Sequence, residues 1–382
     1  MTGSKPQPPN AGGPQAASEA PARLVVIGPL PPFRSGIAQH TAMMCQALAA
    51  QTDLVAISFK RQYPQWLFPG QSDRDPDAVP PDGIEAHYVI DPLNPFTWRR
   101  AVRLLRRHRP DRVVIVWWTV FWAPCFGFLA WICRRQGLHV RLFCHNAVEH
   151  ETSWWRALLT RAVMRRASSF VVHTGADQAN ILRDLPNADI AVRPHPIYSQ
   201  FPAPGAVGRR RRGLELLFFG LVRPYKGLDV LIEAMGRLRG SDVFLTIAGE
   251  FWSGREEIER RIAALGIDDQ IEVIPRYVSD SEAADLFARA DVCVLPYRSA
   301  TGSGVVALAY HYGKPVIATR VGGLPDVILD GETGVLVPPG RPEALAEAIS
   351  ALPAERARAM APAIRDLTAE MTWDNLARVV AA

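Results

Sequence analysis

Two cationic residues, Arg223 and Lys226, lie in a loop between an apolar run and a segment with helical spacing. The loop is bounded by Gly220 and Gly227. Arginine offers a planar fork of donors and lysine a mobile point charge, and both suit a diphosphate. A pair of solvated loop cations is the ordinary alternative. The flanking glycines and the helix start favour a phosphate site.

A second loop of small residues precedes an apolar segment, with the sequence Thr301-Gly302-Ser303-Gly304-Val305. No carboxylate occurs between Asp291 and Asp326, so this loop offers only backbone amides and hydroxyls. The N-terminus of a helix favours negative charge, which makes the loop a candidate anion site.

Other polar or glycine residues also follow apolar runs. Gly249 and Glu250 end one run, and Glu250 is either a partner for a ribose or an exposed side chain. Tyr277 and Val278 follow the run 271–275, where backbone groups could read the edge of a base.

In the first half, a loop through Gly36 follows the first apolar run but does not match GxGxxG, and no GxxxxGK[ST] occurs. His145 and His173 end two further runs. A single histidine is usually structural, but two at strand ends facing one cleft favour a functional role, with His145 ahead. The spacing of the histidines and cysteines suggests no metal site.

Apolar runs alternate with helical segments over 23–200, stop at a Pro-, Gly- and Arg-rich linker at 201–213, and resume over 214–365. This alternation predicts parallel sheets built from right-handed βαβ units. The predicted fold is α/β, with two doubly wound Rossmann-like domains facing a central cleft. Ligands bind beyond the carboxyl ends of such strands, where the residues above fall.

The two ends of the chain have their own predictions. Residues 1–22 are rich in Pro, Gly, Ala and Ser and are expected to form a disordered leader. Residues 366–382 are expected to form a C-terminal helix, for which crossing back to the first domain is one arrangement.

The chain has 382 residues, a net charge of +5 and five cysteines without a CxxC pair. These features fit a cytoplasmic protein with reduced thiols. The spread charge would suit nucleic acid, anionic lipid or an anionic substrate equally.

An uncharged stretch, 113–133, is long enough to cross a membrane. Its β-prone start and Pro124 favour a buried strand to about Trp118, then a loop and a helix from Pro124 to Arg135. A membrane-dipping surface around 117–122 is the alternative.

Several segments resemble the retaining GT-B glycosyltransferases of glycosyltransferase family 4, also called group 1. They are 219–235, 290–297, 313–326 and 330–337, with weaker similarity at the Gly36 loop and at 192–198. The resemblance implies a GT-B fold and transfer from a nucleotide-diphosphate sugar with retention, by same-face attack, without a metal or other cofactor and without a nucleic-acid partner.

The resemblance also implies roles for individual residues. Arg223 and Lys226 match the pair that holds the donor diphosphate, and His145 matches a histidine near the donor sugar. Gly36 matches the glycine that approaches donor phosphate and acceptor, and Val278 a position whose backbone meets the base.

The family usually carries two glutamates, whose positions here are Ala300 and Leu308. The chain instead resembles a branch with a Thr-x-Ser-Gly loop. A non-catalytic relative that binds nucleotide sugar or glycan is therefore the second hypothesis, and a sugar-nucleotide epimerase is a weaker third.

The sequence does not distinguish among a glycan, a lipid-linked and a small-molecule acceptor. Trp- and Arg-rich segments in the first half, at 98–100, 117–122 and 154–166, suggest peripheral contact with the inner face of a membrane. Buried aromatic residues beside a solvated basic face are the equal alternative.

Overall fold

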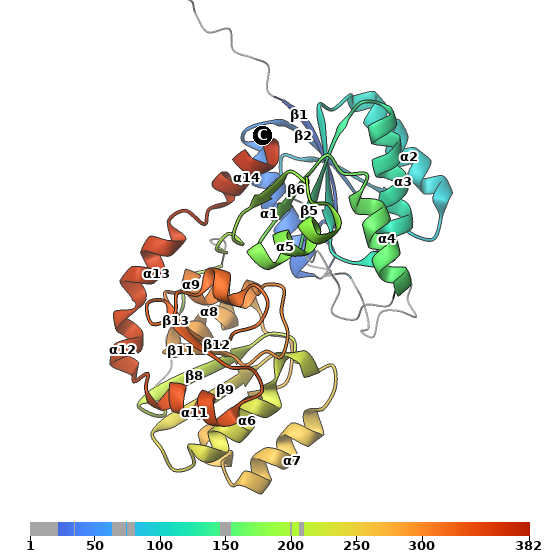
Figure 1. Ribbon diagram of the computed structural model, residues 1–382. Helices are drawn as coiled ribbons and strands as arrows, with labels where there is room; N and C mark the ends of the chain where they lie inside the picture. The colour runs from blue at the N-terminus through green and yellow to red at the C-terminus, as the bar shows by residue number, and fades with distance from the viewer. Residues whose placement is uncertain are drawn as a thin grey trace, which may run out of the picture.

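The computed structural model describes residues 22–33, 35–62, 74, 81–145, 154–198, 201–205 and 210–382. They form two α/β domains (Figure 1). The expected leader, apart from residue 22, and part of the expected linker lie outside the described residues.

The N-terminal domain has a seven-stranded sheet in the order β3-β2-β1-β4-β5-β6-β7, in which every paired strand is parallel. Its strands are β1 (Arg23–Ile27), β2 (Asp53–Phe59), β3 (Glu85–Ile90), β4 (Arg112–Trp117), β5 (His139–Cys144), β6 (Ser169–Val172) and β7 (Ile190–Val192). Its helices are α1 (Gly36–Ala49), α2 (Pro95–His108), α3 (Ala123–Arg135), α4 (Trp154–Met164) and α5 (Gly175–Asp184).

The C-terminal domain has a six-stranded parallel sheet in the order β10-β9-β8-β11-β12-β13. Its strands are β8 (Leu214–Phe219), β9 (Val243–Ala248), β10 (Ile271–Ile274), β11 (Val292–Leu295), β12 (Val316–Thr319) and β13 (Gly334–Val337). Its helices are α6 (Leu228–Arg237), α7 (Arg255–Leu265), α8 (Asp280–Arg289), α9 (Gly304–His311), α10 (Leu324–Val327) and α11 (Pro342–Ser350).

Each sheet reverses its strand order once, between β1 and β4 in the first domain and between β8 and β11 in the second. At such a switch point neighbouring loops leave in opposite directions and open a crevice beyond the strand ends. The topology therefore directs attention to the loops after β1, β4, β8 and β11.

The chain ends in three helices, α12 (Ala354–Ala359), α13 (Ala361–Thr368) and α14 (Trp373–Ala381), which run along one side of both domains (Figure 1). Helix α14 packs against α1 of the N-terminal domain. The guanidinium of Arg112 donates to the carbonyl of Ala381 at 2.5 Å, and that of Arg141 donates to Val380 at 2.9 Å. These cations satisfy carbonyls at the negative end of the α14 dipole.

The tryptophans of the segment 117–122 lie in the interior. Trp117, Trp118 and Trp122 are buried, and the Trp122 ring stacks on Phe126 with centroids 5.6 Å apart. The membrane-dipping alternative at 117–122 is therefore wrong, because these rings fill the space between the sheet and α3. Within the described part of the chain, no helix is both long and apolar enough to span a bilayer.

Strand β3 was missed by the sequence analysis. Its sequence, Glu85-Ala-His-Tyr-Val-Ile90, mixes polar and apolar residues because it is an edge strand, paired only with β2. An edge strand is only partly covered, so the continuous apolar signal of the central parallel strands is absent.

Candidate functional site

The loop after β8 is held in one conformation by its contacts with the loop after β11. Gly227 has φ = 66°, and a Cβ there would lie 2.1 Å from the carbonyl oxygen of Pro296. The backbone N–H of Arg298 donates to Tyr225 at 2.7 Å, and its guanidinium pairs with Asp229. Only glycine permits this close approach, which places Lys226 at the switch point of the second sheet.

Lys226 is a buried cation, with 8% of its surface exposed. No carboxylate lies within ion-pair distance of it among the residues that the structure describes. Burial first, and the nearby Arg223 cation second, lower the pKa of Lys226 to about 8. A bound anion would favour the charged form of Lys226 again.

Arg223 lies three residues before Lys226 and packs against an aromatic ring. Its guanidinium carbon lies 3.7 Å from the centroid of the Trp252 ring, close enough for a cation–π interaction. Its buried Nε has no hydrogen-bond partner within the described residues. The ring fixes the guanidinium plane, which limits the rotamer entropy lost when an anion binds.

The loop after β11 leads into α9. The hydroxyl of Ser303 accepts from the N–H of Val305 at 3.3 Å and so caps the helix. Gly304 lies against Tyr198, whose hydroxyl would be 3.0 Å from a Cβ at that position. A Cβ on Gly302 would lie 3.9 Å from the methyl group of Thr174, so this loop borders the first domain at two places.

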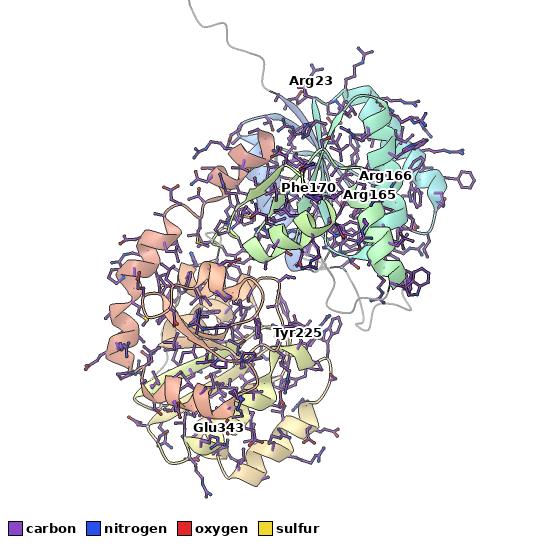
Figure 2. All side chains as sticks on the ribbon, viewed as in Figure 1. Arg23, Arg165, Arg166, Phe170, Tyr225 and Glu343 are labelled. Carbon is purple, nitrogen blue, oxygen red and sulfur yellow. The ribbon has the colours of Figure 1, made fainter. Side chains whose placement is uncertain are left out.

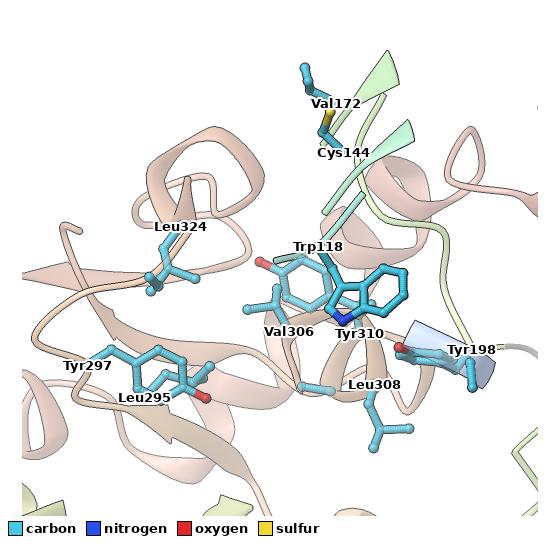
Figure 3. Close-up of a cluster of buried hydrophobic side chains, with 14 of the residues drawn as sticks. Trp118, Cys144, Val172, Tyr198, Leu295, Tyr297, Val306, Leu308, Tyr310 and Leu324 are labelled. Carbon is cyan, nitrogen blue, oxygen red and sulfur yellow. The ribbon is translucent and has the colours of Figure 1, made fainter. Parts of the chain in front are cut away.

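The two positions where the family's glutamates were expected are apolar and packed. Ala300 is 7% exposed and Leu308 is 4% exposed. Figure 3 shows Leu308 in a buried cluster with Val306, Tyr310 and Tyr198. These side chains consolidate the interior of the protein.

The backbones after β8 and β9 touch each other. The N–H of Gly220 donates to Ala248 at 2.9 Å, and a Cβ on Gly249 would lie 2.2 Å from the carbonyl oxygen of Gly220. A Cβ on Gly220 itself would meet the Lys226 ammonium at 3.3 Å. The structure thus brings Gly220, Gly249 and Lys226 together in one place.

The remaining predicted residues of this domain lie around that centre. Glu250 has an exposed side chain, and its carbonyl accepts from Val222 at 2.8 Å. Tyr277 is exposed and Val278 is buried, both after β10, two strands away from β8. Figure 2 shows Tyr225, from the loop after β8, on the side of this domain that faces the first domain.

In the N-terminal domain, His145 follows β5, and its backbone N–H donates to Trp117 at 2.9 Å. Its ring lies among those of His40, His173 and His195, with centroids 4.5 Å from His40 and 5.3 Å from His173. Burial, followed by His173 and His195, holds the pKa of His145 well below its ordinary value. The ring is therefore neutral. Sequence analysis missed His40 and His195, because neither follows a predicted strand end as clearly as His145 and His173 do.

Gly36 is the first residue of α1, and Ser35 caps that helix by accepting from Ala38 at 3.0 Å. No atom lies within 4 Å of where a Cβ on Gly36 would be, so the helix start is open. Beside this loop lies a hollow of about 480 Å³, lined by Pro32, Phe33, Phe59, Lys60, Arg74 and Tyr88. Sequence analysis missed this hollow, which is assembled from four separate segments.

The domains meet directly at the start of α5. The N–H of Gly175 donates to a carboxylate oxygen of Asp326 at 2.8 Å. Gly323 abuts Thr174, whose methyl group would lie 2.1 Å from a Cβ on Gly323. These contacts set the histidine-bearing edge of the first sheet opposite the Thr301–Val305 loop of the second.

Comparison with known proteins agrees with this architecture. Residues 35–196 match the model of a glycosyl transferase 4-like domain, and residues 213–355 match glycosyl transferases group 1. The chain is 31% identical over 332 residues to a D-inositol 3-phosphate glycosyltransferase of Mycobacteroides abscessus, covering 81% of this chain and 73% of that protein. A protein of the same name from Geodermatophilus obscurus is 34% identical over 345 residues, covering 81% and 75%.

Solved structures share the fold at lower identity. Sucrose-phosphate synthase from Thermosynechococcus elongatus superposes with a TM-score of 0.75 at 19% identity, covering 94% of this chain and 97% of that one. Anabaena HepE in complex with UDP gives 0.71 at 15% identity, covering 94% and 98%. The two parallel-sheet domains are those of GT-B glycosyltransferases, and the chain belongs to the group 1 glycosyltransferases, enzymes that transfer a sugar.

Proposed function

We propose that this glycosyltransferase transfers a sugar from a nucleotide-diphosphate donor to its acceptor with retention of anomeric configuration. The observation that carries the proposal is Lys226, a buried cation beside Arg223 with no carboxylate at ion-pair distance among the described residues. Both cations follow β8 at the switch point, where ligands of doubly wound sheets bind.

The cations would act on the leaving group. As the bond between sugar and diphosphate breaks, negative charge accumulates on the phosphate oxygens, and preorganised cations stabilise that charge without reorganisation. The acceptor hydroxyl would attack from the face that the diphosphate leaves, and a departing phosphate oxygen would take its proton. His145, with a neutral ring, would contact the donor sugar.

The donor loop must hold the sugar without the customary acids. Positions Ala300 and Leu308 are packed, so recognition would fall to the hydroxyls of Thr301 and Ser303 and the amides of Gly302 to Val305. The solved complexes of Anabaena HepE contain UDP, glucose and UDP-glucose. UDP-glucose is therefore the first donor to test.

We propose that the acceptor carries a phosphate group. The curated relatives are named for inositol 3-phosphate, and the hollow beside the Gly36 loop is lined by Lys60 and Arg74 together with Tyr88. Cations beside an aromatic wall suit a phosphorylated ring or a phosphate at the head of a lipid.

A lipid-linked acceptor finds support in one face of the first domain. Trp154 and Trp155 on α4 are 80% and 44% exposed, Phe96 in the first turn of α2 is 72% exposed, and Trp131 on α3 is 40% exposed. Figure 2 shows Arg165 and Arg166 at the end of α4. Exposed aromatics among arginines suit an anionic membrane surface. Sedimentation with anionic vesicles at low and high salt tests this surface, and no binding at either salt would remove it.

Release of nucleotide from a panel of nucleotide-diphosphate sugars tests the main proposal. The wild-type protein should release nucleotide with one donor, faster when a phosphorylated polyol is present. The variant R223A/K226A should lose this activity while its circular dichroism and cooperative melting are kept. Unchanged turnover in that folded variant would disprove the role of the two cations.

A non-catalytic relative that binds nucleotide sugar is the second candidate, favoured by the apolar residues at Ala300 and Leu308. Binding would raise the melting temperature in the presence of one donor. If a donor stabilises the protein but no acceptor or water ever releases nucleotide, this candidate replaces the enzyme.

A further inference from the structure

The two cations of the loop after β8 lie against aromatic rings. The guanidinium carbon of Arg223 is 3.7 Å from the centroid of the Trp252 ring. The ammonium of Lys226 is 5.6 Å from the centroid of the Tyr297 ring. An aromatic face attracts a cation electrostatically but carries no net charge. Each cation therefore has a neighbour that attracts it without neutralising it.

Other arginines of the second domain have carboxylate partners. Three such pairs are Arg298 with Asp229, Arg276 with Glu282, and Arg320 with Asp330. The guanidinium of Arg223 forms no hydrogen bond or ion pair with any residue that the structure describes, and its Nε is buried. The positive charge of Arg223 is therefore not offset by a carboxylate in the described part of the chain.

The backbone brings the Trp252 ring to Arg223. Beyond the ends of β8 and β9 the two segments continue side by side, because Val222 and Phe251 form a parallel bridge. The N–H of Val222 donates to Glu250 at 2.8 Å, and the N–H of Trp252 donates to the carbonyl of Val222 at 3.3 Å. Arg223 and Trp252 directly follow the bridged residues. Main-chain hydrogen bonds thus set the register in which the ring meets the guanidinium.

A ring and a carboxylate would hold an arginine with different consequences for an anionic ligand. A free arginine side chain loses rotamer entropy when a ligand fixes it, and a stacked guanidinium has lost part of that entropy already. A carboxylate would also fix the side chain, but it would occupy the N–H donors and cancel the charge that a diphosphate needs. A ring leaves both the donors and the charge available.

We propose that Trp252 is a positioning residue for donor binding, which holds the Arg223 guanidinium in place at the end of β8 without neutralising it. This inference rests on the proposed function, in which Arg223 binds the donor diphosphate. Trp252 acts through Arg223, so its effect on the ligand disappears where Arg223 is absent. The Trp252 side chain is 43% exposed, and the fold therefore tolerates its replacement.

Calorimetric titration with UDP and with inorganic pyrophosphate tests the proposal, because pyrophosphate supplies the diphosphate without base or sugar. Trp252→Phe keeps a ring and should bind both ligands within about two-fold of wild type. Trp252→Leu keeps apolar bulk without an aromatic face and should bind them about ten-fold more weakly. Trp252→Glu would fix the guanidinium but neutralise it, and should weaken binding further, by about 30-fold or more relative to wild type.

A double-mutant cycle separates this role from a general effect on the domain. In an R223A background, Trp252→Leu should cause no further loss of affinity. Leu329→Ala is the matched control, because Leu329 is 42% exposed in the same domain and precedes β13. It should leave both affinities unchanged. Cooperative melting of each variant verifies that the fold is kept.

The outcomes distinguish this inference from the proposed function. If R223A weakens binding and Trp252→Leu does not, only the positioning role of Trp252 fails. The same conclusion follows if Trp252→Leu weakens binding equally with and without Arg223, or if Trp252→Glu binds as wild type does. If R223A leaves binding unchanged, or if wild type binds neither ligand, the role of the cations in the proposed function fails as well.

Discussion

The loops at the carboxyl ends of the strands form one edge of each sheet. These two edges occupy equivalent places in their domains, but their side chains differ in charge. In the first domain, the loops after β5 and β6 present His145 and His173, both held neutral by burial. In the second, the loop after β8 presents Lys226 and Arg223, and its neighbour after β11 offers hydroxyls and amides. One edge is uncharged and the other is cationic.

Under the proposed function, this difference matches what each edge would face. An anionic diphosphate needs fixed positive charge, and Lys226 bears the cost of burial so that the charge is in place before the ligand arrives. A sugar or a neutral hydroxyl needs donors and acceptors without net charge, which neutral imidazoles supply. The same doubly wound scaffold would then support two half-sites through loop residues alone.

The largest effect is expected at Lys226 on the cationic edge, where one substitution should lower activity and raise stability. The substitution Lys226→Met should lower turnover by about 10²- to 10³-fold, as the loss of a preorganised transition-state contact does. It should also raise the free energy of unfolding at pH 7, by up to about 3 kcal/mol, because the charged form of this lysine is disfavoured in the folded state. Urea unfolding and nucleotide release measure the two effects.

Lys314 provides the matched control. Burial lowers its pKa too, but its ammonium donates to the carbonyl of Ala288 at 3.1 Å, and it lies just before β12, at the amino end of that strand. Lys314→Met should keep turnover near the wild-type value. Equal losses in both variants would show that the edge position of Lys226 is irrelevant.

The next effect compares one glycine from each edge. A Cβ on Gly249 would lie 2.2 Å from a backbone carbonyl and would need φ = 151°, whereas a Cβ on Gly28 would meet a methyl group of Val116 at 2.8 Å. The backbone of Gly220 can shift less than the side chain of Val116 can. Gly249→Ala should therefore lose about 3 kcal/mol or more of stability together with donor binding, and Gly28→Ala about 1–2 kcal/mol. Denaturant unfolding measures both losses of stability. A larger loss in Gly28→Ala than in Gly249→Ala would contradict this comparison.

The third effect concerns pH at the cationic edge. Lys226 has a pKa of about 8 in the free protein, and a bound diphosphate favours its protonated form. Affinity for UDP should be constant below pH 8 and should then fall, by at most about ten-fold per pH unit. Calorimetry at pH 8.5 in two buffers of different ionisation enthalpy should show proton uptake on binding.

The stability of the unliganded protein should change with pH in the opposite direction to the affinity for UDP. Between pH 8 and the ordinary lysine value of 10.5, the unfolded chain holds a proton on this residue that the folded chain has lost. The contribution of Lys226 to stability therefore rises with pH across that window. In Lys226→Met both pH dependences should flatten, and a wild-type profile in that variant would assign them to another group.

The sequence predicted the cationic edge better than the neutral one. Arg223 and Lys226 lie three residues apart in one loop, so their proximity follows from local spacing and the strand–loop–helix pattern. His40, His145, His173 and His195 come from four elements, and only the strand order and the length of α1 bring them together. Such a cluster is a property of topology, and one sequence does not specify it.

The strands also differ in how well the sequence predicted them. Central strands such as β11, and β4 from Val113 on, are continuous apolar runs and were predicted from sequence, whereas the polar edge strand β3 was not. The aromatic run at 117–122 resembled a membrane surface because an apolar sequence looks the same whether protein or lipid covers it. Only the packing of Phe59 and Phe126 against those rings distinguishes the two.

The smallest expected effect tests the contact that sets the two edges opposite each other. Asp326 of the second domain accepts from the N–H of Gly175 at the start of α5, where the helix dipole favours a negative charge. Asp326→Asn keeps an acceptor and removes the charge, so it should cost less than about 1 kcal/mol. Asp326→Ala removes both and should cost more. If the contact also aligns the two edges, Asp326→Ala should raise KM for the donor while kcat stays nearly constant. The free-energy cost of aligning the domains would then fall on donor binding. An equal fall in kcat would instead place Asp326 in the chemistry of the site.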